Sequence, residues 1–172
     1  MAEEIINRVA NSKLVTINLE DFYQEGTRFE IDLKNWLVEG FILREKEFRA
    51  ELKSHDWSVY KDAYVALHCS IDAIVPAWAY MLISSHLSQF AKKIIYGNLE
   101  TLESILYAEV LQSFDASEFK NKPIIIKGCS NKPVPQNAYL LLQQKLQPEV
   151  KSIMFGEACS AVPLYKQSRN KV

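Results

Sequence analysis

The chain has 172 residues, of which 48% are hydrophobic, and it carries a formal net charge of -1 at pH 7. This length fits one domain with a sizeable buried core, and the balanced charge excludes the basic stripe that follows a nucleic-acid backbone. The opening stretch, "MAEEIINRVANSK", has neither the basic start nor the apolar run of a secretory signal. The longest apolar stretch, residues 73–84, is too short to span a bilayer. We therefore expect a cytoplasmic protein that binds neither nucleic acid nor membrane.

The first 56 residues lack a regular alternation and predict an irregular α+β portion at the edge of a sheet. Short runs at residues 14–19 and 28–31 are typical of strands. Asp32 is placed to cap a short helix, because its carboxylate can accept a hydrogen bond from an amide of the first turn. Residues 43–55 predict a polar helix with an apolar inner face.

From residue 57 onward, strand and helix patterns alternate. Short apolar, β-favouring runs predict four strands, near residues 64–69, 94–96, 123–128 and 152–156. Helices are expected between them, over residues 76–91, 98–114 and 135–146. Strands joined by helical crossovers of this length form a parallel sheet. We therefore predict a single three-layer α/β domain over residues 1–166, with covering elements at 1–56, a parallel βαβ core at 57–166 in the order 2-1-3-4, and a flexible tail at 167–172.

A short motif recurs around all three cysteines of the chain: Cys-Ser followed within a few residues by Val-Pro, in "HCSIDAIVP", "GCSNKPVP" and "ACSAVP". No longer internal repeat is evident. Cys69, Cys129 and Cys159 each follow a predicted strand, and the carboxyl edge of a parallel sheet is where open α/β folds bind ligands. In the order 2-1-3-4 the three cysteine-bearing strands are neighbours about 4.8 Å apart. We therefore expect the three thiols to share one site.

The surroundings of the cysteines favour the thiolate form. Cys69 and Cys129 lie just before predicted helices that open at Pro76 and Pro135, and a helix N-terminus stabilises a thiolate. Soft sulfur ligands select zinc or an iron–sulfur cluster. The serines that follow the cysteines are expected to donate hydrogen bonds to the sulfurs or to cap the turns: Ser70, Ser130 and Ser160. A fourth ligand is open, with four candidates by their place in the sequence: Asp72, Glu157, His55 and His68.

Two other interpretations remain beside the metal site. A free cysteine often packs as a small hydrophobe, in which case the chain is an interaction domain with structural cysteines. Alternatively, Cys129 after Gly128 is the nucleophile of a thiol enzyme that acts on a small molecule at the sheet edge, although the sequence places no base beside it. The chain has no glycine-rich phosphate loop and no Gly-x-Ser-x-Gly elbow, so those enzyme classes are not indicated.

Three blocks, "CSIDAIVPAWAYM", "IKGCSNKPVP" and "KSIMFGEACSAVPLYK", resemble an uncharacterised bacterial family catalogued as a domain of unknown function, number 2480. The stretch "EKEFRAELKSHDWSVY" is similar to the family's segment before the first cysteine, and the resemblance covers nearly the whole chain except residues 167–172. The family has no assigned activity. The resemblance implies an association of the family's genes with those for iron–sulfur cluster assembly. This association would favour an iron–sulfur cluster over zinc as the bound group. It also implies that the partners are proteins of cluster assembly. We expect a metal- or cluster-binding accessory protein with Cys69, Cys129 and Cys159 as ligands.

Overall fold

The computed structural model describes residues 14–128, 131–157 and 159–168. The chain divides into two compact units, each with its own sheet: unit 1 comprises Met1–Tyr23 and Leu106–Val172, and unit 2 comprises Gln24–Ile105. Unit 2 is therefore inserted between the first strand of unit 1 and the rest of it. In the described ranges, no helix combines the length and apolar character needed to cross a membrane.

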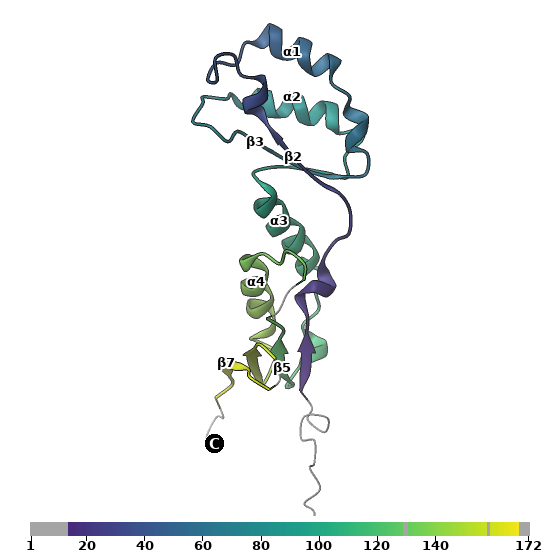
Figure 1. The fold of residues 1–172 in the computed structure, drawn as a ribbon. Helices are drawn as coiled ribbons and strands as arrows, with labels where there is room; N and C mark the ends of the chain where they lie inside the picture. The colour runs from purple at the N-terminus through teal and green to yellow at the C-terminus, as the bar shows by residue number, and fades with distance from the viewer. Residues whose placement is uncertain (1–13, 129–130, 158, 169–172) are drawn as a thin grey trace, which may run out of the picture. The chain divides into compact units, whose positions relative to one another are not determined.

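Unit 2 is an α/β unit built on a parallel sheet in the order β2-β3-β4. Its elements are β2 (Arg28–Asp32), the 3₁₀ helix η2 (Leu33–Trp36), α1 (Glu45–Ser54), η3 (Trp57–Tyr60), β3 (Tyr64–His68), α2 (Ala77–Leu87) and β4 (Lys93–Tyr96) (Figure 1). Side chains from the sheet and both helices form one core, which includes Ile31, Phe48, Leu52, Val65, Leu67, Ala79, Ile83 and Leu87. The central strand β3 is buried from Tyr64 to Leu67, as expected for a parallel strand covered on both faces.

Unit 1 is built on a sheet in the order β1-β5-β6-β7. Its elements are β1 (Val15–Ile17), η1 (Leu19–Phe22), η4 (Ser117–Phe119), β5 (Pro123–Ile126), α4 (Gln136–Leu146), β6 (Ser152–Phe155) and β7 (Val162–Lys166). Helix α3 (Leu99–Gln112) begins in unit 2 and ends in unit 1. The first three strands of the sheet are parallel, and β7 pairs antiparallel with β6. The core includes Ile17, Leu19, Tyr107, Leu111, Ile124, Ile126, Ala138, Leu142, Leu146 and Ile153.

The α/β class is confirmed, as is the parallel pairing of β5 with β6. The predicted single sheet with the order 2-1-3-4 is wrong, because β3 and β4 lie in one sheet and β5 and β6 in another. That order required β3 to pair with β5. Instead β2 pairs with β3, and β1 pairs with β5. The two N-terminal strands therefore occupy the edges of β3 and β5 that would have paired with each other in a single sheet. The N-terminal residues are thus integral to both sheets rather than a cover for one.

The C-terminal strand β7 was not predicted. A proline such as Pro163 removes a backbone donor and is uncommon inside a strand. β7 is an edge strand, where a proline is tolerated, and its pairing shifts register beside Met154. The flexible tail predicted at residues 167–172 stays a prediction: residues 169–172 lie outside the described ranges. The amide of Gln167 still donates to the Lys151 carbonyl at 2.9 Å, which continues the β7 pairing.

The two units are copies of one supersecondary arrangement. With Pro76 aligned to Pro135, each unit reads 3₁₀ helix, strand, Pro-led helix, strand, at a constant spacing in the chain. Each also contains an earlier strand with an Asx residue at its C-terminal end, Asp32 as the last residue of β2 or Asn18 directly after β1, whose side chain caps the following 3₁₀ helix. The sequence analysis found no repeat longer than the cysteine motif, and that conclusion is wrong.

Rare backbone conformations recur at matching positions of the two units. Asp62 and Asn121 both adopt a positive φ, of 56° and 58°, and Gly97 and Gly156 have φ of 135° and 117°. Non-glycine residues seldom adopt positive φ, so a matched pair is strong evidence of equivalence. The amides of these residues also donate matching hydrogen bonds to backbone carbonyls. The amide of Asp62 donates to Phe90 at 2.8 Å, and that of Asn121 donates to Glu149 at 2.9 Å. In the same way, the amide of Gly97 donates to Leu67 at 2.8 Å, and that of Gly156 donates to Ile126 at 3.0 Å.

This equivalence predicts that alanine substitutions at matched core positions lower the free energy of unfolding by similar amounts. Ile83 in α2 and Leu142 in α4 are both 0% exposed and occupy equivalent places. Ile83→Ala and Leu142→Ala should each lower the free energy of unfolding by about 3 kcal/mol, because each removes buried methyl groups and leaves a cavity. Urea unfolding measures the loss.

The matched controls are Met81→Ala and Leu140→Ala, at equivalent helix positions that are 70% and 56% exposed. Each should cost less than about 0.5 kcal/mol. Losses as large as those at Ile83 and Leu142 would contradict the assignment of the buried helix faces.

Candidate functional site

The described cysteines lie at strand ends but in different units. Cys69 follows β3 in unit 2 and is half-buried, with its Sγ 3.6 Å from the Ile71 carbonyl oxygen. Cys159 follows β6 in unit 1 and is exposed. Both are free thiols. Cys129 and Ser130 lie outside the described residues.

The expected metal site stays a prediction. Among the described residues, no group of three histidine, cysteine, aspartate or glutamate side chains is placed to hold a metal ion. Three candidates for a fourth ligand have other partners: Glu157 is 3.9 Å from Lys127, His68 is 3.5 Å from Glu30, and His55 is 3.2 Å from the Tyr60 hydroxyl. The Ser160 amide donates to the Glu157 carbonyl at 2.9 Å.

The structural repeat makes the recurrence of the cysteine motif weaker evidence for a shared site. In the sequence aligned at Pro76 and Pro135, Cys69-Ser70 and Cys129-Ser130 both fall between a strand and a Pro-led helix, and they are offset by one position. Two of the three motifs therefore recur together with the repeated strand and helix that flank them in the sequence. The third motif differs, because a strand, β7, follows Cys159 in place of a helix.

Asp32 holds the Cys69–Ser70 turn in unit 2. Its Oδ1 accepts hydrogen bonds from the amides of Ser70 at 3.1 Å and Lys34 at 3.0 Å, and its Oδ2 is 3.1 Å from Lys34 Nζ. Burial raises the pKa of Asp32, but the hydrogen bonds from Ser70 and Lys34 outweigh burial and hold the pKa well below its ordinary value. The cap on η2 was predicted from the sequence, whereas the tie to Ser70, far along the chain, was not.

Two tyrosines pack beside this turn. The rings of Tyr80 and Tyr96 lie 5.0 Å apart, edge to face, at the carboxyl end of β4. Burial raises the pKa of Tyr80 to about 12, with Tyr96, Cys69 and Asp32 adding to the effect. The phenol therefore stays protonated at neutral pH and remains a hydrogen-bond donor. Unit 1 has the same ring contact, but between Tyr139 and Phe155, so the second hydroxyl belongs to unit 2 alone.

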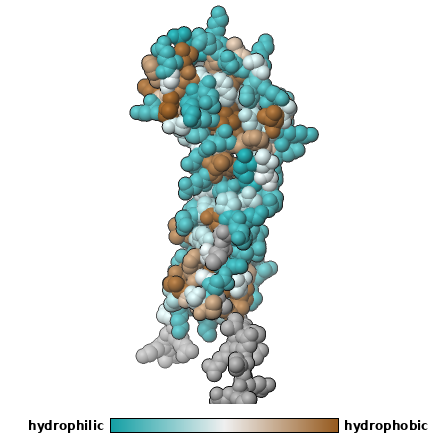
Figure 2. Space-filling view, in the orientation of Figure 1, coloured by the Kyte–Doolittle hydropathy of each residue, from teal (hydrophilic) through white to brown (hydrophobic). Residues whose placement is uncertain are grey.

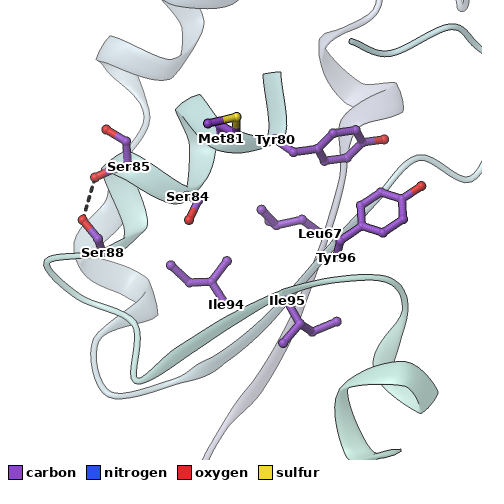
Figure 3. Close-up of a pocket in the computed structure, with 9 residues that line it drawn as sticks. All are labelled: Leu67, Tyr80, Met81, Ser84, Ser85, Ser88, Ile94, Ile95 and Tyr96. Carbon is purple, nitrogen blue, oxygen red and sulfur yellow. Dashed lines mark hydrogen bonds between the residues drawn. The ribbon is translucent and has the colours of Figure 1, made fainter. Parts of the chain in front are cut away.

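A groove runs from these tyrosines along β4, between the strand and α2 (Figure 3). It has a volume of about 430 Å³ and is lined by Leu67, Tyr80, Met81, Ser84, Ser85, Ser88, Ile94, Ile95 and Tyr96. Ile94 points from β4 toward the serines of α2 in Figure 3. Met81 and Tyr96 are each 70% exposed, so apolar surface extends from the groove to its rim.

The same place in unit 1 is built differently. Where α2 has Ser84, Ser85 and Ser88, α4 has the longer side chains Gln143, Gln144 and Gln147. Strand β7 covers the outer edge of β6, and its Tyr165 lines a hollow of about 340 Å³ together with Gln144, Gln147 and Pro148. Among the described residues, no strand pairs with the outer edge of β4. Unit 2 therefore differs from its copy by shorter side chains on the helix and by an uncovered strand edge.

The interactions of Asp32 generate a prediction. Asp32→Ala should lower the free energy of unfolding at pH 7 by about 1 to 2 kcal/mol, because it removes the cap on η2 and the tie to Ser70. Asp32→Asn is the matched control, since Asn18 performs the capping role in unit 1, and it should cost less. Urea unfolding of the three proteins measures both losses.

The lowered pKa gives this contribution a pH dependence. Stability from the Asp32 carboxylate is present above the pKa of the unfolded chain, about 4, and is lost as the pH falls toward the lower folded-state pKa. The difference in stability between the wild type and Asp32→Asn should therefore shrink as the pH is lowered below about 4. A difference that grew on acidification would show that the carboxylate is not stabilised by its partners.

Comparisons with known proteins place the chain in one family. A search of curated proteins and a search of solved structures each return no match. A family model described as "Protein of unknown function (DUF2480)" matches residues 3–167, which is nearly the whole chain. The resemblance noted in the sequence is therefore confirmed, and the chain belongs to the DUF2480 family.

Proposed function

We propose that this protein is a binding module, and that unit 2 binds a segment of another polypeptide in the groove between α2 and β4. The observation that carries the proposal is the difference between the two copies. Unit 1 carries longer side chains on α4 and covers its strand edge with β7, whereas unit 2 has shorter side chains on α2 and an apolar groove beside a β4 edge that no described strand covers. An uncovered strand edge beside an apolar groove is a common way to bind an extended peptide.

The surface of unit 2 supports this role. Most of the large apolar side chains exposed on the described residues belong to unit 2: Phe41, Ile42, Val59, Ile71, Ile74, Trp78, Met81, Tyr96 and Leu99. Figure 2 shows apolar side chains at the surface of this part of the chain, surrounded by hydrophilic ones. Of these, Met81 and Tyr96 line the groove, and exposed apolar surface with polar groups around it is typical of interaction sites. Exposed methionine adds adaptability, because its flexible thioether fills irregular contacts.

The groove lining favours binding over catalysis. Its titratable side chains are Tyr80 and Tyr96, and the lining contains no pairing of a nucleophile with a base. Nucleophilic catalysis requires such a pair within hydrogen-bond reach. The hydroxyls of the two tyrosines and the three serines instead give the groove polar groups that orient a ligand by hydrogen bonds.

A peptide library displayed on phage tests the proposal. Peptides selected on the full chain should bind a Ser84→Gln, Ser85→Gln, Ser88→Gln triple variant about tenfold more weakly or worse, since the longer side chains would project into the space that the serines leave open in the groove. Glutamine is a good helix former, so the fold should tolerate the change. Ser54→Gln, at the exposed end of α1, is the matched control and should leave binding unchanged. Binding that is equally strong in the triple variant would overturn the proposal.

A second proposal retains the thiols. We propose that Cys69, Cys129 and Cys159 are ligands of zinc or an iron–sulfur cluster, with Ser70, Ser130 and Ser160 as supporting donors and with proteins of iron–sulfur cluster assembly as partners. It is supported by two free thiols that are open to solvent at least in part: Cys69, which directly follows β3, and Cys159, which lies four residues after the end of β6. In the related enzyme hypothesis, Cys129 alone is the nucleophile.

Metal analysis of full-length protein purified without oxygen tests the thiol proposal. Each of Cys69→Ser, Cys129→Ser and Cys159→Ser should lower the bound metal to a similar degree, because three ligands of one ion act as a unit. Ser113→Ala is a control outside the cysteine loops. Metal content that is unaffected by any one of the three substitutions would contradict a shared three-thiol site.

A further inference from the structure

We infer that the groove of unit 2 binds a partner strand that pairs antiparallel with β4 and carries an aromatic side chain followed directly by an acidic one. This inference rests on the proposed binding function and specifies the chemistry of its ligand. Its source is the other copy, in which the chain itself supplies a strand to the equivalent place.

Strand β7 is the template for the missing strand. It runs antiparallel along β6, with Lys166 opposite Ser152, Tyr165 opposite Ile153 and Val162 opposite Phe155. In unit 2 the residues equivalent to Ser152, Ile153 and Phe155 are Lys93, Ile94 and Tyr96. A partner strand that pairs with β4 in the same register would therefore lie opposite Lys93, Ile94 and Tyr96.

The backbone of β4 is oriented to accept this strand. The amides of Lys93 and Gly97 donate to Ala63 and Leu67, at 3.4 and 2.8 Å, and so point toward β3. Because amide directions alternate along a strand, the amides of Ile94 and Tyr96 point to the outer edge. The equivalent residues of β6 are the ones that β7 pairs with in unit 1.

An aromatic anchor follows from the packing of Tyr165. In unit 1 this ring is partly buried against the core, and it lines a hollow of about 340 Å³ with Gln144, Gln147 and Pro148 of the helix and its C-terminal end. At the equivalent place in unit 2 stand Ser85 and Ser88, which line the open groove. The groove therefore has the space that the ring of an aromatic residue opposite Ile94 would occupy, and burying that ring supplies most of the apolar contact.

Charge selects the next residue of the partner. In unit 1, Lys166 faces the neutral Ser152, whereas in unit 2 the opposite position is Lys93. Opposite charges directly across a strand pair stabilise it, and like charges destabilise it. The β7 strand of a second copy would place Lys166 opposite Lys93. The preferred occupant is therefore a strand from a different protein, with an acidic residue at this position.

Two synthetic peptides test the inference against the full chain. The first has the sequence of residues 161–167, AVPLYKQ, and the second is its Lys166→Glu form. The Lys166→Glu peptide should bind about tenfold more tightly and should shift the backbone NMR signals of β4 rather than those of β6. In a Lys93→Glu protein the preference should reverse, so that the natural sequence binds more tightly. A Tyr165→Ala form of the acidic peptide should lose binding.

The outcomes separate this inference from the proposed function. Suppose that the serine-to-glutamine variant abolishes the binding of the library peptides, but that neither synthetic peptide shifts the NMR signals of β4. The groove then binds a ligand, as proposed, but the inference of a paired strand is overturned. A preference that does not reverse in Lys93→Glu overturns the charge pairing. Concentration-dependent dimerisation through β4, seen by sedimentation and by the same NMR signals, would identify a second copy as the occupant and also overturn the inference.

Discussion

Strand edges are the constraint on which this structure depends. A strand at the edge of a sheet exposes unpaired amides and carbonyls, and these must be paired, covered or used for binding. Each unit pairs one edge of its central strand with an N-terminal strand, β2 on β3 and β1 on β5. The outer edges are treated differently, because β7 covers β6 while no described strand covers β4. This difference at the outer edge is one of the features on which the proposed binding role of unit 2 is based.

The duplication also supplies an internal reference. Two copies of one arrangement in the same chain share the same helix-to-strand contacts, so residues that differ between them stand out. Tyr80 and Tyr139 preserve a ring contact, whereas Tyr96 and Phe155 differ by one hydroxyl. On the helix that faces the outer strand, unit 2 has Ser84, Ser85 and Ser88 where unit 1 has the longer Gln143, Gln144 and Gln147. Such differences direct attention to the α2–β4 groove more specifically than the cysteine motif does.

The sequence predicted the individual elements well and their assembly poorly. Local signals were sufficient for α1, for the cap at Asp32 and for the helices after Pro76 and Pro135. Which strand edges pair was not encoded in periodicity, since an apolar run is equally suited to either sheet. The repeat was hidden because equivalent core positions use different apolar residues, as Ile83 and Leu142 do.

The candidate groove escaped sequence analysis for a related reason. Serines on a helix, such as Ser85 and Ser88, are typical of a solvated face, and only comparison with Gln144 and Gln147 reveals that they leave space. The tie between Asp32 and Ser70 joins residues far apart in the chain, so no local pattern contains it. The cysteines were found easily because they are rare, which is no measure of their importance.

The insertion of unit 2 inside unit 1 has a consequence for how the chain folds during synthesis. All the strands of unit 2 emerge from the ribosome within one continuous stretch, so that unit can fold as soon as β4 is made. Unit 1 must wait, because Val15 in β1 pairs with Ile124 in β5. Contacts separated by so much intervening chain close slowly. The nascent N-terminus thus carries an unpaired β1 while a complete folded unit already follows it, and the enclosing unit is completed last.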